Sequence, residues 1–169
     1  MIKTDKRNKR IFKDKVKSEF DQKILNIRRV VRVVKGGRRF SFSVAMILGD
    51  RKGAISLGVG KASDTALAIQ KAVRDAKKNM TKIKLTKEMS LPHEIKSKFC
   101  SSKVILMPNN GKGLVAGGSV RDILELAGIK DVSSKIISRS KNKLNNAQAT
   151  LKALRKFKIN YENTPSKKK

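Results

Sequence analysis

The amino-acid sequence predicts an α+β fold, with a β-β-β-α unit in the first half of the chain and a smaller β-α-β-α unit in the second. Three observations predict it. In residues 40–48 every second side chain is large and apolar, as in a strand with one buried face. From residue 62 the apolar spacing changes to four and three, the period of a helix. A glycine-rich segment at residues 108–118 then leads from a strand into a second helical pattern.

The first half is expected to contain three strands joined by two tight turns. Residues 24–34 are rich in β-branched side chains, which favour strands. The turn KGGR at residues 35–38 leads into residues 40–48, so these segments predict a hairpin with one apolar face. After a second turn at residues 49–53, residues 54–60 predict the third strand.

The helix after these strands is expected to pack on their apolar face. Ser63 is expected to cap its N-terminus, with Asp64 in the first turn, where the helix dipole favours an anion. The apolar stripe comprises Ala62, Ala66, Ile69, Val73, Ala76 and Met80. The opposite side carries Lys71, Arg74, Lys77 and Lys78.

The second half opens with a predicted strand at residues 103–107. Ser119 to Asp122 are typical of a capping box, and Gly128 is a typical C-terminal stop. A strand at residues 132–138 and a helix at residues 146–157 complete the unit. The side chains expected to face the core are Val120, Ile123, Leu124 and Ala127 in the first helix and Ala147, Leu151 and Leu154 in the second.

Four segments are expected along the chain. They are a basic flexible extension (1–19), a first domain (20–84), an α/β domain (85–160) and a basic disordered tail (161–169). The boundary is placed in residues 81–94, which contain a proline and give weak signals of order. Both ends carry too few apolar side chains to form a core.

The composition favours a nucleic-acid partner. The 169 residues include 42 Lys or Arg and only 13 Asp or Glu, a formal net charge of +29. Such a charge destabilises a compact monomer by self-repulsion, so we expect a polyanion to neutralise it. An anionic membrane surface is a weaker candidate, because no long helical pattern pairs a Lys-rich face with bulky apolar residues.

Several functional classes are not expected. One cysteine, Cys100, and one histidine, His93, are too few for an internal disulfide or a Cys/His zinc site. They stand seven residues apart with no third group to form a relay, so we expect no catalytic or metal site, no cofactor and no enzyme. The chain lacks a membrane-length apolar run and a secretory signal, so we expect a soluble intracellular protein.

Two glycine-rich segments resemble phosphate-binding loops only loosely. Gly58-Val-Gly60-Lys61 precedes a helix but lacks the first glycine and the Ser or Thr of a P-loop. Gly111 to Ala116 fits a loose dinucleotide pattern, with Asp131 about 20 residues on, but the helix starts only after residue 118. We expect the latter glycines to permit a tight turn or a close backbone approach.

The first hairpin is the strongest functional candidate. Its tip concentrates Arg28, Arg29, Arg32, Lys35, Gly36, Gly37, Arg38 and Arg39. Arg28 and Arg32 are expected on one face, and Gly36 is expected to take a positive φ in the turn. With one Tyr and no Trp, base stacking cannot dominate, which favours recognition of the shape and phosphates of double-stranded RNA. The alternative is a solvated basic hairpin; for the helix stripe Lys71, Arg74 and Lys78 a solvated face is more strongly expected.

Longer segments resemble the family of the bacterial fifth protein of the small ribosomal subunit. They are VVKGGRRFSF (33–42), LGVGKA (57–62), AIQKAVRDAKKNM (68–80), LPHEI (91–95), KVILMP (103–108), GLVAGGSVRDILELAG (113–128) and NNAQATLKAL (145–154). The chain departs from the family pattern in the turn at residues 139–143, at Arg51, where a glycine is common, and in a loop at residues 108–113 that is one residue short.

This resemblance implies a first domain similar to the double-stranded-RNA-binding fold and a ribosomal role. It implies a place near the neck of the small subunit, beside its fourth and eighth proteins, close to the path by which messenger RNA enters, with support for accurate decoding. No membrane or homo-oligomer is expected, and the location is cytoplasmic, although an organellar ribosome stays open. By position, the resemblance implies that Lys35, Gly36, Gly37 and Arg38 form the RNA-binding loop and that Gly113 and Arg121 contact the fourth protein. The charge pattern adds to the expected RNA-binding set the other hairpin cations together with Lys61, Lys71, Arg74 and Lys78.

Two other functions stay open at this point. A free-standing double-stranded-RNA-binding assembly factor would have the same basic hairpin. A nucleotide-dependent enzyme would use the loop at residues 111–118.

Overall fold

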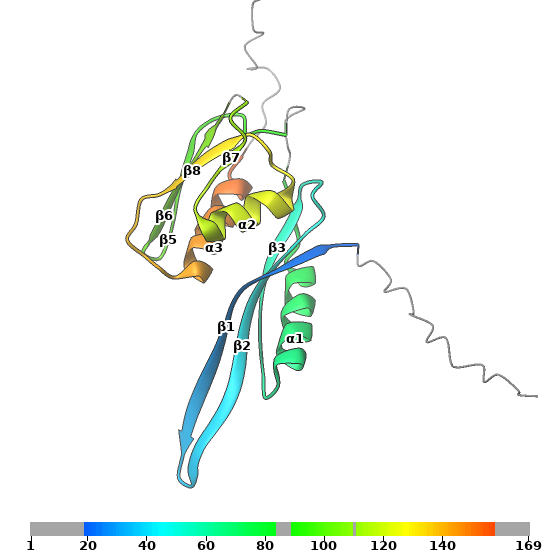
Figure 1. Cartoon of the computed structure of the whole chain (residues 1–169), viewed down its shortest axis with the longest axis vertical. Coiled ribbons are helices and arrows are strands. Elements are labelled where there is room, and N and C mark those ends of the chain that lie inside the picture. Colours follow the sequence, from blue (N-terminus) through cyan, green and yellow to red (C-terminus); the bar gives the residue numbers. More distant parts are fainter. Residues whose placement is uncertain (1–18, 84–88, 110, 158–169) are drawn as a thin grey trace, which may run out of the picture.

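The structure, a computed structural model, describes residues 19–83, 89–109 and 111–157 and has the expected α+β class (Figure 1). The first sheet has the order β1-β2-β3-β4, with β1 (Asp21–Val34), β2 (Gly37–Gly49), β3 (Ala54–Ala62) and β4 (Thr81–Lys82), and it carries helix α1 (Thr65–Lys78). The second sheet has the order β5-β6-β8-β7, with β5 (Ile95–Phe99), β6 (Ser102–Pro108), β7 (Leu114–Val115) and β8 (Val132–Ile136). Helices α2 (Gly118–Ala127) and α3 (Lys143–Arg155) belong to the second half.

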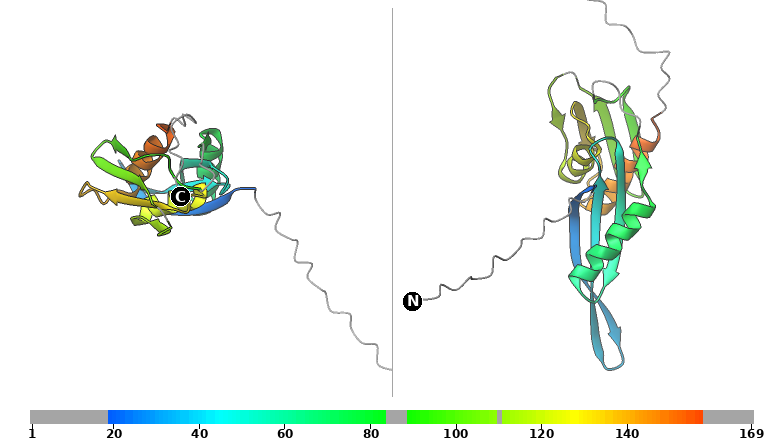
Figure 2. Two further views of the ribbon diagram at one scale, coloured as in Figure 1. Left: turned by 90° about the horizontal axis from the view of Figure 1, so that it is seen from above. Right: turned by 90° about the vertical axis from the view of Figure 1, so that its right-hand side faces the viewer.

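The elements stack in four layers. Helix α1 covers one face of the first sheet, whereas α2 and α3 lie between the other face of that sheet and the second sheet (Figure 2). The expected extension and tail, apart from Glu19 in the former, and the boundary at residues 84–85 lie outside the described residues. No helix among the described residues is long and apolar enough to cross a membrane.

Strand β2 is buried on both faces along its second half. Val44 packs with Ala68 of α1, while Ile47 belongs to the core formed with α2 and α3. The strand is buried without interruption from Val44 to Gly49. The expectation of a single apolar face was therefore wrong, because helices from both halves of the chain cover this sheet.

Helix α1 approaches β3 closely because both elements present small residues. A Cβ placed at Gly58 would overlap the carbonyl oxygen of Ala72, and one at Gly60 would overlap that of Ala68. The residues buried on the helix are Ala68, Ala72 and Ala76. The expected stripe was wrong at Ala66, which is exposed, because the glycines of β3 admit a face of the helix lined by alanine. The N-cap is Asp64, whose carboxylate accepts a hydrogen bond from the Thr65 N–H, and not Ser63.

The turn between β2 and β3 docks against the C-terminus of α2. The backbone N–H groups of Arg51 and Gly53 donate to the carbonyls of Leu126 and Ala127 at 3.0 and 3.1 Å. These bonds satisfy carbonyls that a helix end leaves without intrahelical partners. A Cβ at Gly128, which ends α2 at φ 83° as expected, would overlap the Arg51 carbonyl, so the two backbones are in close contact at this point.

Ion pairs also link β1 to α2 and to the β2–β3 turn. The Lys23 ammonium lies 2.7 Å from Asp122 and 3.3 Å from Glu125, both on α2. Its hydrogen bond to Asp122 raises the pKa of Lys23 above the ordinary lysine value. Arg51, which has φ 56° where glycine is common in the family, pairs with Asp21 at 2.6 Å.

Three strands, β4 in the first sheet and β5 and β7 in the second, were not expected from the sequence. Strand β5 pairs antiparallel with β6, β7 runs parallel to β8, and β4 adds to the first sheet. The capping box at Ser119 was wrong: the N-cap of α2 is Gly117, and Ser119 is buried inside the helix. All seven side chains expected to face the core from α2 and α3 are buried.

The turn at residues 139–143, where the sequence departs from the family pattern, is stabilised by side-chain hydrogen bonds. Asn142 caps α3 by accepting from the Leu144 N–H at 3.2 Å. The Asn146 amide donates to the Ser140 carbonyl at 3.1 Å. The chain therefore orders this turn without the glycine and proline of the family pattern.

We predict that Gly58→Ala destabilises the protein. The added methyl group overlaps the backbone of α1, so the helix must move, at a cost of about 1–3 kcal/mol. Urea denaturation measures the change, with Gly36→Ala as the control, because a Cβ at Gly36 meets nothing within 4 Å. The close packing of α1 on β3 is refuted if both variants unfold at the same urea concentration.

Candidate nucleic-acid interface

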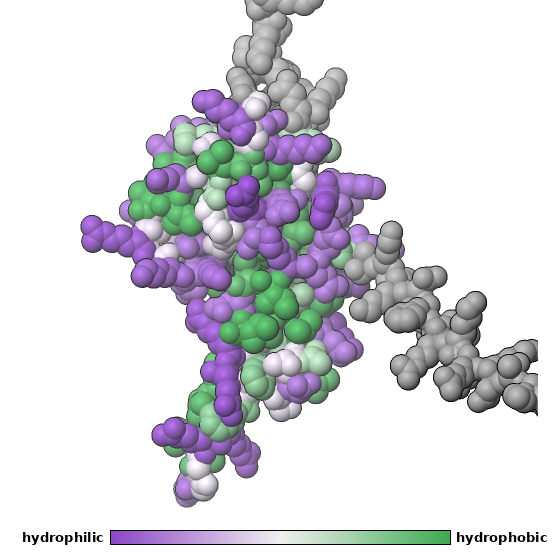
Figure 3. Space-filling view, in the orientation of Figure 1, coloured by the Kyte–Doolittle hydropathy of each residue, from purple (hydrophilic) through white to green (hydrophobic). Residues whose placement is uncertain are grey.

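The distal half of the β1–β2 hairpin projects beyond the helices that cover its base (Figure 1). Burial on β2 stops at Val44, and residues 37–40 are exposed. The structure places all eight hairpin candidates in this exposed part: Arg28, Arg29, Arg32, Lys35, Gly36, Gly37, Arg38 and Arg39. Hydrophilic side chains follow the ribbon to its tip, with apolar ones between them (Figure 3).

The register of the hairpin divides these cations between two faces. Arg32 lies directly opposite Arg39, and Arg28 lies opposite Ser43. Arg28 and Arg32 thus share one face, as expected, and Arg39 joins them; we call this the cationic face. Two like charges directly opposite each other destabilise a strand pair. An external anion would relieve that repulsion.

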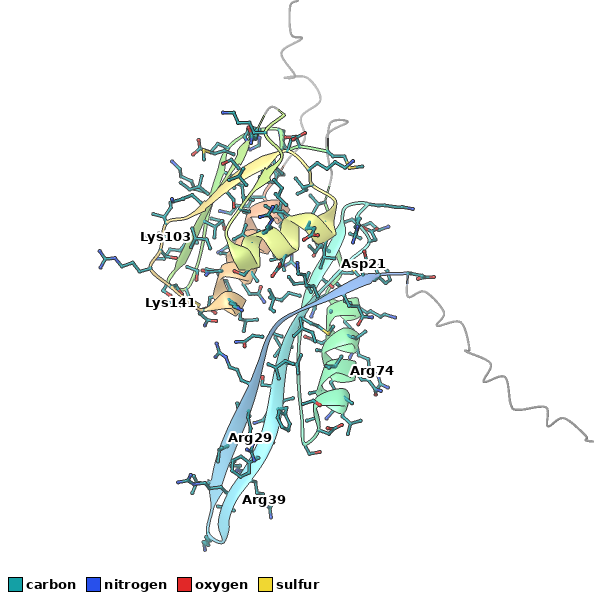
Figure 4. The ribbon with its side chains drawn as sticks, viewed as in Figure 1. Asp21, Arg29, Arg39, Arg74, Lys103 and Lys141 are labelled. Carbon is teal, nitrogen blue, oxygen red and sulfur yellow. The ribbon has the colours of Figure 1, made fainter. Side chains whose placement is uncertain are left out.

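The other face of the hairpin mixes cations with exposed apolar side chains. Val31, Val33 and Phe40 are 47%, 76% and 44% exposed. The guanidinium carbon of Arg29 lies 3.7 Å from the centre of the Phe40 ring, a cation–π contact that orients the arginine. Arg38 belongs to the same face, because it pairs with Val33. Figure 4 shows Arg29 and Arg39 near the tip.

The turn at the tip requires a glycine at one position. Gly37 has φ 137°, whereas Gly36, where a positive φ was expected, does not have one. No atom lies within 4 Å of a Cβ built at either residue. These glycines therefore serve no internal packing, and the backbone at the tip is open to a partner.

A second basic stripe lies on the outer side of α1. Lys71, Arg74 and Lys78 are all exposed, and Arg74 points away from the sheet (Figure 4). The Lys71 ammonium donates to the Lys61 carbonyl at 3.4 Å, so Lys61 adjoins the stripe. We call Lys71, Arg74 and Lys78 the α1 stripe. The stripe lies on the same side of the sheet as Arg29 and Arg38, whereas Lys61, in register with Ser43 and Arg28, lies on the side of the cationic face.

Most acidic side chains in the described part of the chain are engaged by the fold. Carboxylates accept hydrogen bonds at the N-cap of α1, in the β2–β3 turn and from the Val59 N–H. Others form ion pairs with neighbouring cations. The engaged residues are Asp21, Asp50, Asp64, Asp75, Glu94, Asp122, Glu125 and Asp131. No ion pair within the described residues involves the hairpin tip or the α1 stripe, so their positive charge is free to meet a polyanion.

The loop that loosely matches a dinucleotide motif is held by its own side chains. The Gly113 N–H donates to the Asp131 carboxylate at 3.1 Å, and the Asn109 amide donates to the Gly113 carbonyl at 3.4 Å. Gly111 and Gly113 both have φ 71°, which favours glycine. Asp131 therefore stabilises the conformation of this loop.

The remaining candidates do not form one site. Arg121 is exposed in the first turn of α2, while its neighbour Asp122 is paired with Lys23. The His93 ring packs edge-on against Phe157, with 5.3 Å between centroids, and Cys100 is exposed in the β5–β6 turn. Among the described residues, no group of three His, Cys, Asp or Glu side chains is placed to hold a metal ion.

The sequence analysis missed a set of lysines on the second sheet. Lys96, Lys98, Lys103 and Lys135 alternate with buried residues on β5, β6 and β8. The alternation in IKSKF and VSSKI was the signal that could have revealed them.

Comparison with known proteins identifies relatives of both halves. The family described as "Ribosomal protein S5, N-terminal domain" matches residues 20–84, and "Ribosomal protein S5, C-terminal domain" matches residues 97–162. The small ribosomal subunit protein uS5 of Mycoplasmopsis agalactiae is 47% identical over 142 residues, which are 83% of this chain and 61% of that protein. The uS5c protein of Gracilaria tenuistipitata is 45% identical, covering 92% of this chain and 91% of its own. The uS5 protein of Campylobacter jejuni is 46% identical, covering 84% and 96%.

Proposed function

The chain belongs to the ribosomal protein S5 family, and on that premise we propose that it binds small-subunit ribosomal RNA through the β1–β2 hairpin and the α1 stripe. As a member of this family it is a structural protein of the small ribosomal subunit. We infer a structural role and not a catalytic one.

The unpaired positive charge of the exposed hairpin carries this proposal. Its cations have no ion-pair partners in the described chain, while the acids are engaged elsewhere. Each phosphate that a cation neutralises releases condensed counterions, which favours binding regardless of base sequence. Recognition then rests on phosphates and RNA shape, because the chain has no Trp and one Tyr for stacking.

The two faces of the hairpin support insertion between RNA segments. The cationic face presents Arg28, Arg32 and Arg39 on one side, and Arg29 and Arg38 lie on the other. A ribbon with cations on both sides and at its tip suits a narrow space lined by phosphates on both walls. The α1 stripe extends the second side toward the body of the protein.

We further propose that the exposed start of α2 contacts another ribosomal protein. Arg121 is a cation in the first turn of a helix, where the dipole disfavours it by up to about 1 kcal/mol. Asp122, the nearest acid in sequence, is paired with Lys23 and does not compensate it fully. By resemblance the contact is with the fourth small-subunit protein and includes Gly113, with the eighth protein nearby. Support for accurate decoding, close to the messenger path, follows from that position.

A free-standing RNA-binding assembly factor is the alternative role. Its RNA chemistry would be the same, so binding alone does not separate the two. Sedimentation does: a structural component is recovered in stoichiometric amounts with small subunits after a moderate salt wash, and an assembly factor is lost from mature subunits.

We predict that Lys35→Ala/Arg38→Ala weakens RNA binding by loss of phosphate neutralisation. The slope of log affinity against log salt should fall by about one unit per lost contact. Lys130→Ala/Lys152→Ala is the control, because it removes the same charge from exposed positions outside the proposed interface. An equal slope for the two variants would exclude the hairpin tip from the interface.

We predict that Arg121→Ala leaves the melting temperature of the free protein unchanged or slightly higher, because it removes a cation that opposes the helix dipole. The same substitution should weaken association with the fourth small-subunit protein, measured by pull-down with purified components. Lys130→Ala provides the comparison at another exposed cation. Undiminished association would show that Arg121 simply faces solvent.

A further inference from the structure

Strand β3 has a free edge along most of its length. Strand β4 pairs only with Ala54 and Ile55, and the described chain places no strand beside the rest of β3, up to Ala62. In an antiparallel strand the N–H and C=O of one residue point to the same side, and this side alternates along the chain. The Val59 N–H bonds outside the sheet, so Leu57 and Lys61 also direct their backbone groups to this edge.

Side chains of α1, which runs alongside β3 (Figure 1), bond to this edge. One carboxylate oxygen of Asp75 accepts from the Val59 N–H at 2.9 Å, and the other accepts from the Asn79 side-chain amide at 3.3 Å. The Lys71 ammonium donates to the Lys61 carbonyl at 3.4 Å. The helix thus supplies an acceptor and a donor where a neighbouring strand would supply its own backbone groups.

The glycines of β3 bring α1 close enough for these contacts. A Cβ at Gly58 would overlap the backbone of Ala72 and Ala76, so any larger residue there would push the helix away from the strand. Gly60 faces the preceding turn of the helix in the same way. Because aspartate has a short side chain, Asp75 reaches the edge of β3 only at this close approach.

A free strand edge is a template for pairing with another chain, and folded proteins block such edges with charges or covering elements. The edge of β3 would suit pairing, because Val59 is β-branched and 43% exposed. Two copies of one edge can pair antiparallel about a two-fold axis, which makes a second copy of this chain the fitting occupant.

We propose that Asp75, oriented by Asn79, blocks the edge of β3 against pairing with a second copy of this chain. The proposal goes beyond the proposed function and does not depend on RNA. It assigns to α1 a role in keeping the free protein monomeric, in addition to its packing on the sheet.

The test uses the full chain without RNA and compares three variants with the parent. Asp75→Ala removes the acceptor, whereas Asp75→Asn keeps a side-chain oxygen in the same position. The matched control is Asp64→Ala, because Asp64 also accepts from a backbone N–H, that of Thr65 at 2.7 Å, but at the N-cap of α1. Asp75→Ala and Asp64→Ala both remove one negative charge, and melting temperatures verify that all proteins are folded.

Amide exchange and sedimentation velocity are the two measurements. In dilute protein, the Val59 amide should exchange at least about ten-fold faster in Asp75→Ala than in the parent, because it loses a hydrogen bond to a charged acceptor. Sedimentation is measured with and without added salt, because the net charge of +29 keeps copies apart when it is unscreened. In added salt, Asp75→Ala should form dimers at concentrations at which the parent, Asp75→Asn and Asp64→Ala are monomers.

A second substitution locates the contact. Val59→Pro, added to Asp75→Ala, removes the edge N–H at a position where an edge strand tolerates proline, and it should restore the monomer. Dimers that persist in this double variant would place the contact elsewhere and refute the proposal.

Two further results would also overturn the proposal: a monomeric Asp75→Ala in added salt, or equal association of Asp64→Ala. If Asp75→Ala does not fold, Asn79→Ala takes its place, because it keeps the carboxylate but removes the amide that orients it. Faster Val59 exchange and association in added salt are again expected, and a monomeric Asn79→Ala would then contradict the proposed role.

Discussion

The burial of β2 on both faces is the constraint on which the rest of the structure depends. Val44 faces α1, and Ile47 faces the core of α2 and α3, so one strand joins the two halves of the chain. Backbone contacts between Arg51, Gly53 and the end of α2 fix the same junction. Because this strand continues directly into the hairpin, the packing that holds the halves together also fixes the direction in which the hairpin projects.

The distribution of charge follows from this architecture. Eight acidic side chains accept hydrogen bonds or form ion pairs within the fold: in caps and turns, at the β1–α2 junction, between α1 and β3, and beside β5. The cations of the hairpin tip and of the α1 stripe form no ion pair within the described residues. Self-repulsion among them opposes the compact state, and under the proposed function RNA phosphates would neutralise these charges.

The sequence predicted the elements whose signals are local. The strand at residues 40–48, the glycine stop at Gly128 and the inward faces of α2 and α3 depend on period and capping chemistry, and the structure confirms them. It could not predict features set by tertiary contact. The second buried face of β2, the alanine face of α1 and the short strands β4 and β7 exist only because a distant segment packs beside them. The assignment of RNA binding to the hairpin stays a prediction.

The central claim is that the buried half of β2 anchors an exposed hairpin that binds RNA. Amide hydrogen exchange of the protein, free and bound to small-subunit RNA, tests this claim most directly. We expect the amides of Val44 to Leu48 to exchange only by global unfolding in both states, because both faces of the strand are buried. The amides of residues 28–41 should exchange faster in the free protein and become strongly protected when RNA binds. Unchanged exchange in residues 28–41, with new protection confined to other elements, would contradict the proposed role of the hairpin.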